Sequence, residues 1–120
     1  MPHIAAISIY VDDMDKAIAF YRDTLGFGVR ARPVPFITEL EHDGTALILC
    51  QAEQPSPMEY PVSGGTVIGI AETDIAARAR ELAASGVDLI HTSPQDFPGG
   101  QYIALRDPAG NVVELLEFAV

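Results

Sequence analysis

The sequence predicts an α+β fold in which two strand-helix-strand-strand-strand (βαβββ) modules form a cupped, mostly antiparallel half-barrel. Two observations predict this fold. A strand-like segment, a capping aspartate, an amphipathic helix and a terminating glycine occur twice in the same order, with Asp13 and Gly26 in the first copy and Asp74 and Gly86 in the second. Each copy continues into three further strand-like segments. The exposed face of each small sheet must be covered, so we expect the two sheets to curve around a shared cavity.

The first copy begins with a strand over residues 4–11, in which Ile7, Ile9 and Val11 alternate with smaller or more polar residues. Asp13 is suited to cap the helix that follows, and Gly26 is suited to end it. The apolar residues of this helix recur at helical spacing: Met14, Ala17, Ile18, Tyr21 and Leu25. Three strands are then predicted, over residues 28–32, 36–41 and 45–51.

The second copy repeats this order. A strand is predicted over residues 66–71, Asp74 caps the next helix, and Ile75, Ala79 and Leu82 supply its apolar side. Gly86 ends the helix, and strands are predicted over residues 87–91, 101–106 and 112–118.

A chain of 120 residues is the size of one ordinary domain. We therefore expect a single domain over residues 1–120, with module one at 3–53, a linker at 54–65 and module two at 66–120. The linker is rich in proline and ends in two glycines, which disfavours a helix. The alternative is a generic α+β sandwich in which the apparent repeat is a coincidence.

The charge balance argues against polyanionic partners. The net charge is −10 and only 7 residues are Lys or Arg, whereas binding to nucleic acid or to an anionic membrane depends on many cationic side chains. A single cysteine, Cys50, cannot form an internal disulfide. With no secretory signal and no apolar run of spanning length in this sequence, we expect a cytoplasmic protein.

Two segments carry a family resemblance. The first runs from Val11 through Asp13 and Tyr21 to Gly26, and the second is Asp-Pro-Ala-Gly-Asn over residues 107–111, followed by Glu114. They resemble the signatures of the vicinal oxygen chelate superfamily, the group of glyoxalase I, bleomycin-resistance proteins and extradiol dioxygenases. The resemblance covers nearly the whole chain and implies the cupped fold. It does not imply one reaction, because such proteins include lyases, dioxygenases, thiol transferases and drug-binding proteins.

The resemblance also implies where a metal would be held. Metal-dependent members use side chains from the first and last strand of each module, and the matching positions here are Ala6, Ile48, Val67 and Glu114. Only Glu114 carries a donor, and a transition metal needs at least three donor side chains. We therefore expect no protein-held metal and no other cofactor. The alternative is a divalent metal held by Glu114 together with other donors, such as His3 or Glu72.

Without a metal, Glu114 is a carboxylate on an otherwise apolar strand and would need another partner, either a ligand or Arg106 across the hairpin. Tyr102 is predicted on the same sheet face as Ala104 and Glu114. Tyr10, Tyr60, Phe36 and Phe97 are further aromatic candidates, although such residues are often part of the core. The ligand-binding residues predicted from these patterns are Glu114, Tyr102, Tyr10, Cys50 and Phe97; no catalytic residue is predicted.

Several of these residues have simpler interpretations. Phe97 is either the tip of a flap formed by residues 93–100 or part of an ordinary connection. Cys50 is either directed into the cavity or a buried, unreactive thiol. The histidines at positions 3, 42 and 91 are dispersed and are interpreted as solvated or capping residues.

The functional prediction is a homodimer that binds a small organic molecule, cationic or aromatic, in a cavity without a protein-held metal. The dimer is implied by the resemblance alone. Two alternatives stay open: a metal-dependent lyase or dioxygenase of the glyoxalase type that uses Glu114 as one ligand, and a non-catalytic interaction module.

Overall fold

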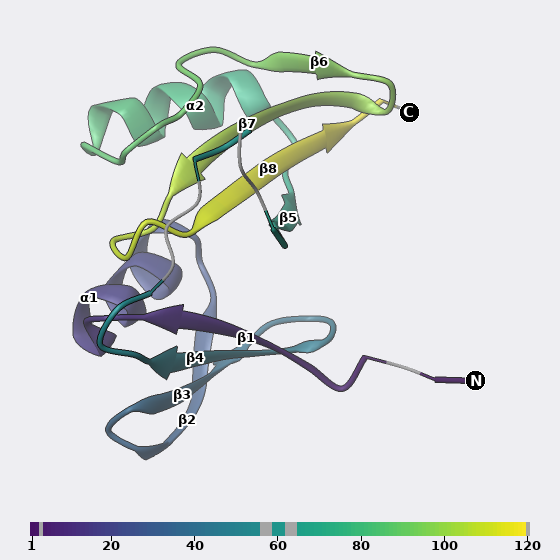
Figure 1. Cartoon of the computed structure of the whole chain (residues 1–120). Coiled ribbons are helices and arrows are strands. Elements are labelled where there is room, and N and C mark those ends of the chain that lie inside the picture. The colour runs from purple at the N-terminus through teal and green to yellow at the C-terminus, as the bar shows by residue number, and fades with distance from the viewer. Residues whose placement is uncertain (3, 56–58, 62–64, 120) are drawn as a thin grey trace. The chain divides into compact units, whose positions relative to one another are not determined.

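The computed structural model describes residues 1–2, 4–55, 59–61 and 65–119. The chain divides into two compact units, Met1–Pro57 and Met58–Val120 (Figure 1). From here on, module one and module two mean these two units, which include the residues predicted as a linker. Each module contains one four-stranded sheet with the predicted order of strand, helix and three strands. The predicted fold class is confirmed.

Module one contains β1 (Ala6–Val11), α1 (Met14–Ala19), η1 (Phe20–Thr24), β2 (Gly28–Val34), β3 (Ile37–Glu41) and β4 (Ala46–Gln51). The sheet has the order β1-β4-β3-β2, in which β1 and β4 are parallel and the remaining neighbours are antiparallel. The helical segment contacts β3 and β4 and covers one face of the sheet. The core of module one includes Tyr21, Leu40 and Leu49.

The predicted first helix is present but changes character before its end. The Asp13 carboxylate accepts a hydrogen bond from the backbone N–H of Lys16 and caps α1. The next segment, η1, is a wider π-helical turn in which the Leu25 N–H bonds to the Phe20 carbonyl. Gly26 has a φ of 88°, which suits glycine at a helix end.

Module two contains β5 (Ile68–Ala71), α2 (Ile75–Ala84), β6 (Gln95–Phe97), β7 (Gly100–Arg106) and β8 (Val112–Phe118). The sheet order is β5-β8-β7-β6, with β5 and β8 parallel. The Asp74 carboxylate caps α2 by accepting the N–H of Ala77, and Glu117 on β8 accepts the N–H of Ile75. Figure 1 shows α2 along one face of this sheet.

The strand predicted over residues 87–91 is wrong, since this segment forms only one isolated bridge, between Leu89 and Leu105. The edge strand is instead β6, which pairs with β7 from Gln95 to Phe97. Phe97 is the last residue of this strand, directly before the turn at residues 98–99, so residues 93–100 include a strand and are not an irregular loop. Pro94, which has no backbone N–H, separates the two segments.

Each sheet has a helix face and an open face, which lies opposite the helix. In module two, Val113 and Leu115 on β8 pair with Leu105 and Ile103 on β7, and all four are fully buried on the helix face. Because side chains alternate along a strand, Glu114 lies on the open face.

The described residues include no helix long and apolar enough to cross a membrane.

Candidate functional site

Glu114 lies in the middle of β8, between Gly69 on β5 and Ala104 on β7. These neighbours are small and Glu114 itself is half-buried, while the Leu116 side chain lies against Gly69. Tyr102 pairs with Leu116 and projects from the same face, as the sequence predicted. The register thus brings Glu114 and Tyr102 together on the open face of module two.

The partner of Glu114 is Tyr60, a residue of the connector ahead of β5. The Tyr60 hydroxyl donates to Oε2 of Glu114 at 2.5 Å, a length typical of a hydroxyl bonded to a charged carboxylate. Burial raises the pKa of Tyr60 well above its usual range, and the hydrogen bond and negative charge of Glu114 raise it further. A smaller contribution comes from a side-chain hydrogen bond with Tyr102. Tyr60 therefore remains a protonated donor at neutral pH.

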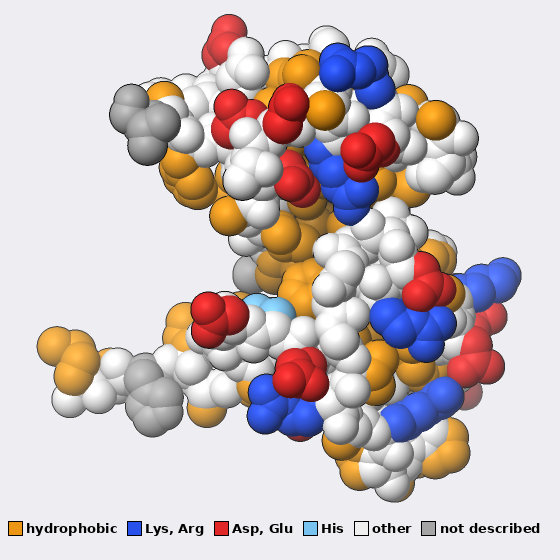
Figure 2. Space-filling model, turned by 180° about the vertical axis from the view of Figure 1, so that it is seen from behind, with side chains coloured by type: hydrophobic (Ala, Val, Ile, Leu, Met, Phe, Trp, Pro, Cys, Tyr) orange, Lys and Arg blue, Asp and Glu red, His pale blue; other side chains and the backbone are white. Residues whose placement is uncertain are grey.

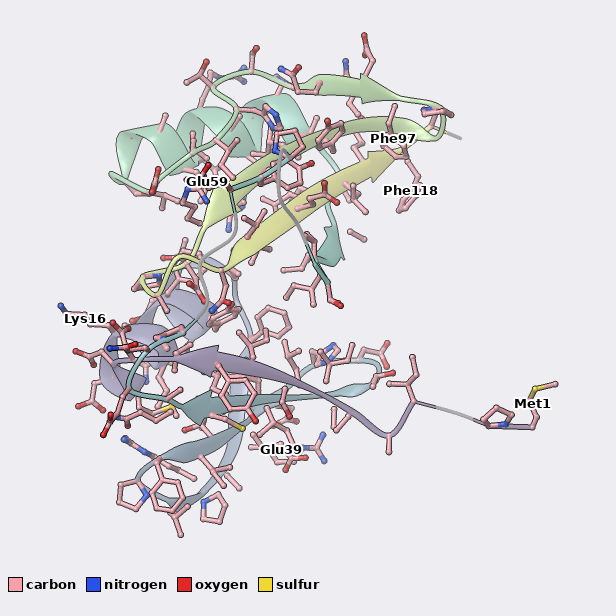
Figure 3. All side chains as sticks on the ribbon, in the orientation of Figure 1. Met1, Lys16, Glu39, Glu59, Phe97 and Phe118 are labelled. Atoms are coloured by element: carbon pink, nitrogen blue, oxygen red, sulfur yellow. The ribbon has the colours of Figure 1, made fainter. Side chains whose placement is uncertain are left out.

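A continuous series of rings lies beside this pair. We call it the aromatic row; it consists of Tyr60, His91, Tyr102, Phe97 and Phe118. Successive ring centroids are 6.1, 5.4, 5.9 and 6.0 Å apart, and each pair meets edge to face. Figure 3 shows Phe97 and Phe118 beside each other at one end of the row. Phe118 is 58% exposed, so this end offers an accessible apolar surface.

His91 is built into the site, which corrects its interpretation as a solvated or capping residue. Its Nδ1 accepts the backbone N–H of Ala104 at 3.1 Å, and its ring is half-buried between Tyr60 and Tyr102. An accepting Nδ1 carries no proton, so the neutral ring holds its proton on Nε2. The imidazole occupies the place of a backbone acceptor beside β7, which accounts for the irregular segment before β6.

Two predicted ligand residues lie in module one. Tyr10 and Cys50 are register partners on β1 and β4, with Tyr10 54% exposed and Cys50 half-buried. They share the open face of module one and are not part of the aromatic row. Arg106, predicted as a possible partner of Glu114, forms its ion pair with Asp88 at 3.9 Å.

The second signature has a structural role at its aspartate. Asp107 is only 4% exposed, and its Oδ1 accepts the backbone N–H groups of Ala109 and Asn111 at 2.9 and 2.8 Å. Oδ2 accepts the side-chain amide of Asn111. The motif thus fixes the turn between β7 and β8, and with it the register that places Glu114.

The donor positions implied by the resemblance do not suit a transition metal. Ser8 pairs with Ile48 in module one as Gly69 pairs with Glu114 in module two, so the isoleucine occupies the position equivalent to the glutamate. Alkyl side chains at Ala6, Ile48 and Val67 provide no ligand atom. Across the described part of the chain, no three His, Cys, Asp or Glu residues lie close enough together to bind a metal ion.

The metal-dependent alternative named two further donors, Glu72 and His3. Glu72 forms an ion pair with Arg78 of α2, at 3.5 Å. His3 lies outside the residues that the structure describes.

Sequence patterns did not predict that Tyr60, His91 and Phe118 belong to one site. Tyr60 lies in the linker, where no strand or helix period assigns a direction to its side chain. His91 fell within a segment predicted as a regular strand. Phe118 has the same parity as Glu114 along β8, and this is the one signal that could have identified it.

Comparisons with known proteins agree with this architecture. The family model described as "Glyoxalase/Bleomycin resistance protein/Dioxygenase superfamily" matches residues 1–115. A protein of Mycolicibacterium smegmatis is 31% identical over 108 residues, covering 90% of this chain and 87% of the relative.

Two solved structures share the fold at 25% identity. One is a lactoylglutathione lyase from Agrobacterium tumefaciens, with a TM-score of 0.73 over 96% of this chain and 92% of the other. The other is TnmS3, an antibiotic binding protein from Streptomyces sp. CB03234, with a TM-score of 0.72 over 99% of this chain and 98% of the other.

Proposed function

The chain belongs to the Glyoxalase/Bleomycin resistance protein/Dioxygenase superfamily, and from this premise we propose that module two binds a small organic molecule on its open face without a protein-held metal. The ligand has an aromatic part and a positively charged group. One observation carries the proposal: the half-buried carboxylate of Glu114 has a neutral partner, Tyr60, and lies beside the aromatic row.

The charge of this site supports a cationic ligand. A carboxylate withdrawn from water is stabilised by a hydrogen bond, but its negative charge is neutralised only by a cation. This local charge favours a cation more directly than the net charge of −10, because acidic and basic side chains are interspersed on the visible surface of both modules (Figure 2).

The aromatic row supports the apolar part of the ligand. Tyr102 and Phe97 expose half-buried rings on adjacent strands, and Phe118 extends this surface to the end of β8. Rings arranged edge to face present both faces and edges, which suits the stacking of a planar molecule. The antibiotic binding activity in the name of TnmS3 is consistent with such a role.

The proposal favours binding over metal-dependent lyase chemistry. The lactoylglutathione lyase is as similar in fold, but the donor set here offers one carboxylate where a bound metal needs several ligands. Elemental analysis of protein purified without chelator tests this point. Near-stoichiometric zinc, nickel or iron that is lost in Glu114→Gln would support the metal-dependent alternative.

Thermal-shift screening against aromatic amines and cationic antibiotics, followed by calorimetry, tests the binding function. A ligand at 100 times its Kd adds about 2.7 kcal/mol to the free energy of unfolding. We expect Glu114→Gln to weaken binding at least tenfold. Glu39→Gln is the matched control, because Glu39 is a half-buried glutamate on the open face of module one. Equal binding by both variants would contradict the proposal.

We also propose that the protein forms a homodimer in the cytoplasm and that residues 1–120 unfold as one domain. The resemblance to the superfamily supports the dimer, and the single cysteine suits a reducing compartment. Sedimentation equilibrium tests the dimer. A single, probe-independent unfolding transition tests the one-domain assignment.

A further inference from the structure

We infer that Tyr60 determines the class of ligand that module two accepts: organic cations with N–H groups, such as protonated amines and amidines, are selected over neutral hydrogen-bond donors. This inference rests on the proposed function and adds a specificity-determining residue to it. The observations are the hydroxyl of Tyr60 on Oε2 of Glu114 and the position of both residues beside the aromatic row.

Neutral ligands must compete with a hydrogen bond that Glu114 already accepts. The Tyr60 hydroxyl already supplies Glu114 with a short hydrogen bond to a charged acceptor, which is stronger than one between neutral groups. An alcohol or amide must either displace this hydroxyl from Oε2, which exchanges one neutral donor for another, or bond to Oε1 of a carboxylate whose charge the Tyr60 hydroxyl already partly satisfies. Displacement costs the Tyr60 hydroxyl its bond to a charged acceptor and leaves it the neutral Tyr102 hydroxyl as a partner, so a neutral ligand gains little.

The second step concerns cations. A hydroxyl partner leaves the full negative charge of Glu114 in place, whereas an ammonium or amidinium group neutralises it and donates N–H groups as well. A carboxylate has two oxygens, so a cation can bond to it beside the Tyr60 hydroxyl or in its place. The same hydroxyl therefore opposes neutral donors without removing the attraction for a cation.

The third step concerns the surroundings of the carboxylate. The rings of Tyr60 and Tyr102 lie on either side of His91, at 6.1 and 5.4 Å between centroids, within the same row. Aromatic faces attract a cation and accept the apolar part of the molecule. A ligand that joins an amine to a ring over a short linker suits both features.

Two probes of nearly equal shape test this inference. Benzylamine is cationic at neutral pH and benzyl alcohol is neutral, and both carry the same ring. Binding of each probe is measured by NMR titration of the intact protein, which detects weak complexes. We expect the wild-type protein to bind benzylamine at least ten times more tightly, a factor that corresponds to about 1.4 kcal/mol.

The variants separate the contribution of the hydroxyl from that of the charge. In Tyr60→Phe the ring stays and the hydroxyl is lost, so we expect benzyl alcohol to bind several times more tightly and the preference for benzylamine to shrink. In Glu114→Gln the preference disappears, whereas Glu39→Gln retains it. The NMR spectrum of the backbone amides verifies that each variant is folded.

The outcomes are distinct. An unchanged preference in Tyr60→Phe would overturn the role of Tyr60 and leave the ligand-binding function in place. Equal binding of both probes by the wild-type protein would overturn this inference together with the positive charge assigned to the ligand, and would leave only the binding of an aromatic molecule. Failure of the wild-type protein to bind either probe would contradict the proposed function, and this inference with it.

Discussion

The open faces of the two modules share one backbone plan but carry different side chains. Ile48 in module one has Ser8 and Glu39 as its register partners, whereas Glu114 in module two has Gly69 and Ala104. The carboxylate thus lies on the last strand in module two and on the neighbouring strand in module one. The register partners of Glu114 are both small, whereas Ile48 places an alkyl side chain at the equivalent position.

The helix faces differ far less. Leu49 in module one and Leu115 in module two are register equivalents, and their exposed fractions are 0% and 1%. Close packing against a helix restricts such positions to apolar residues of suitable volume. The open face is not restricted in this way, so it is where the two modules were free to acquire different chemistry.

The largest expected effect tests the equivalence of the helix faces. We expect Leu49→Ala and Leu115→Ala each to lower the free energy of unfolding by about 2–5 kcal/mol, because each removes a buried side chain and leaves a cavity. Urea denaturation of both variants measures the effect. A loss below about 1 kcal/mol in only one of them would show that the two cores are not packed alike.

A second prediction contrasts the two hairpin turns. Asp107 is buried and accepts three hydrogen bonds, whereas Asp43, in the turn between β3 and β4, is exposed. We expect Asp107→Ala to cost about 2–3 kcal/mol, since it leaves partly buried N–H groups of the turn without their acceptor. Asp43→Ala serves as the matched control, with an expected change within about 0.5 kcal/mol. Similar losses in both turns would contradict the structural role assigned to Asp107.

The fold was largely predictable because its signals are local and repeated. Asp13 and Asp74 cap the two helices as the sequence predicted, and the strand parities place Glu114 and Tyr102 on one face. The strand expected over residues 87–91 failed for a local reason: the His91 side chain takes the place of a backbone acceptor beside Ala104. No pattern of apolar residues reveals such a substitution.

The site was only partly predictable, because it depends on long-range contacts. Tyr60 reaches Glu114 from a linker with no regular period, so the hydrogen bond between them has no local signature. The sequence identified Glu114 as a carboxylate in need of a partner but offered Arg106 or a ligand. The structure adds a partner that the sequence did not offer, the hydroxyl of Tyr60.

A third prediction uses the comparison to improve stability. Thr38 in module one is the register equivalent of Ile103 in module two, and both are fully buried. The Oγ1 atom of Thr38 has no hydrogen-bond partner among the residues that the structure describes. We expect Thr38→Val to raise the free energy of unfolding by about 1 kcal/mol, since it removes an unsatisfied hydroxyl at nearly constant volume.

Urea denaturation of Thr38→Val beside Thr66→Val separates this effect from a general benefit of valine. Thr66 is exposed ahead of β5, so its substitution is expected to change stability by less than about 0.5 kcal/mol. If Thr38→Val instead lowers the free energy of unfolding, the Thr38 hydroxyl has a hydrogen-bond partner in solution.

The smallest expected effect concerns Tyr60, which precedes β5 in module two. The residues that precede β1 in module one, 1–5, contain no tyrosine. Burial and Glu114 raise the pKa of Tyr60 above the ordinary value of 10.0, so the folded protein keeps a proton that the unfolded chain releases. The stabilisation associated with this proton is therefore complete below pH 10 and declines as the pH rises further. The site is partly solvated, so we expect a change below about 1 kcal/mol.

The free energy of unfolding at about pH 9 and about pH 11 measures this decline in the wild-type protein and in Tyr60→Phe. We expect the variant to lose less stability over this interval, because its ring has no proton to release in the unfolded state. A smaller loss of stability in Tyr60→Phe would show that the raised pKa belongs to the Tyr60 hydroxyl, which is bonded to Glu114 on the open face of module two. Equal losses in the two proteins would mean that Tyr60 ionises as readily in the folded state as in the unfolded chain, and its contact with Glu114 would then be too weak to select a ligand.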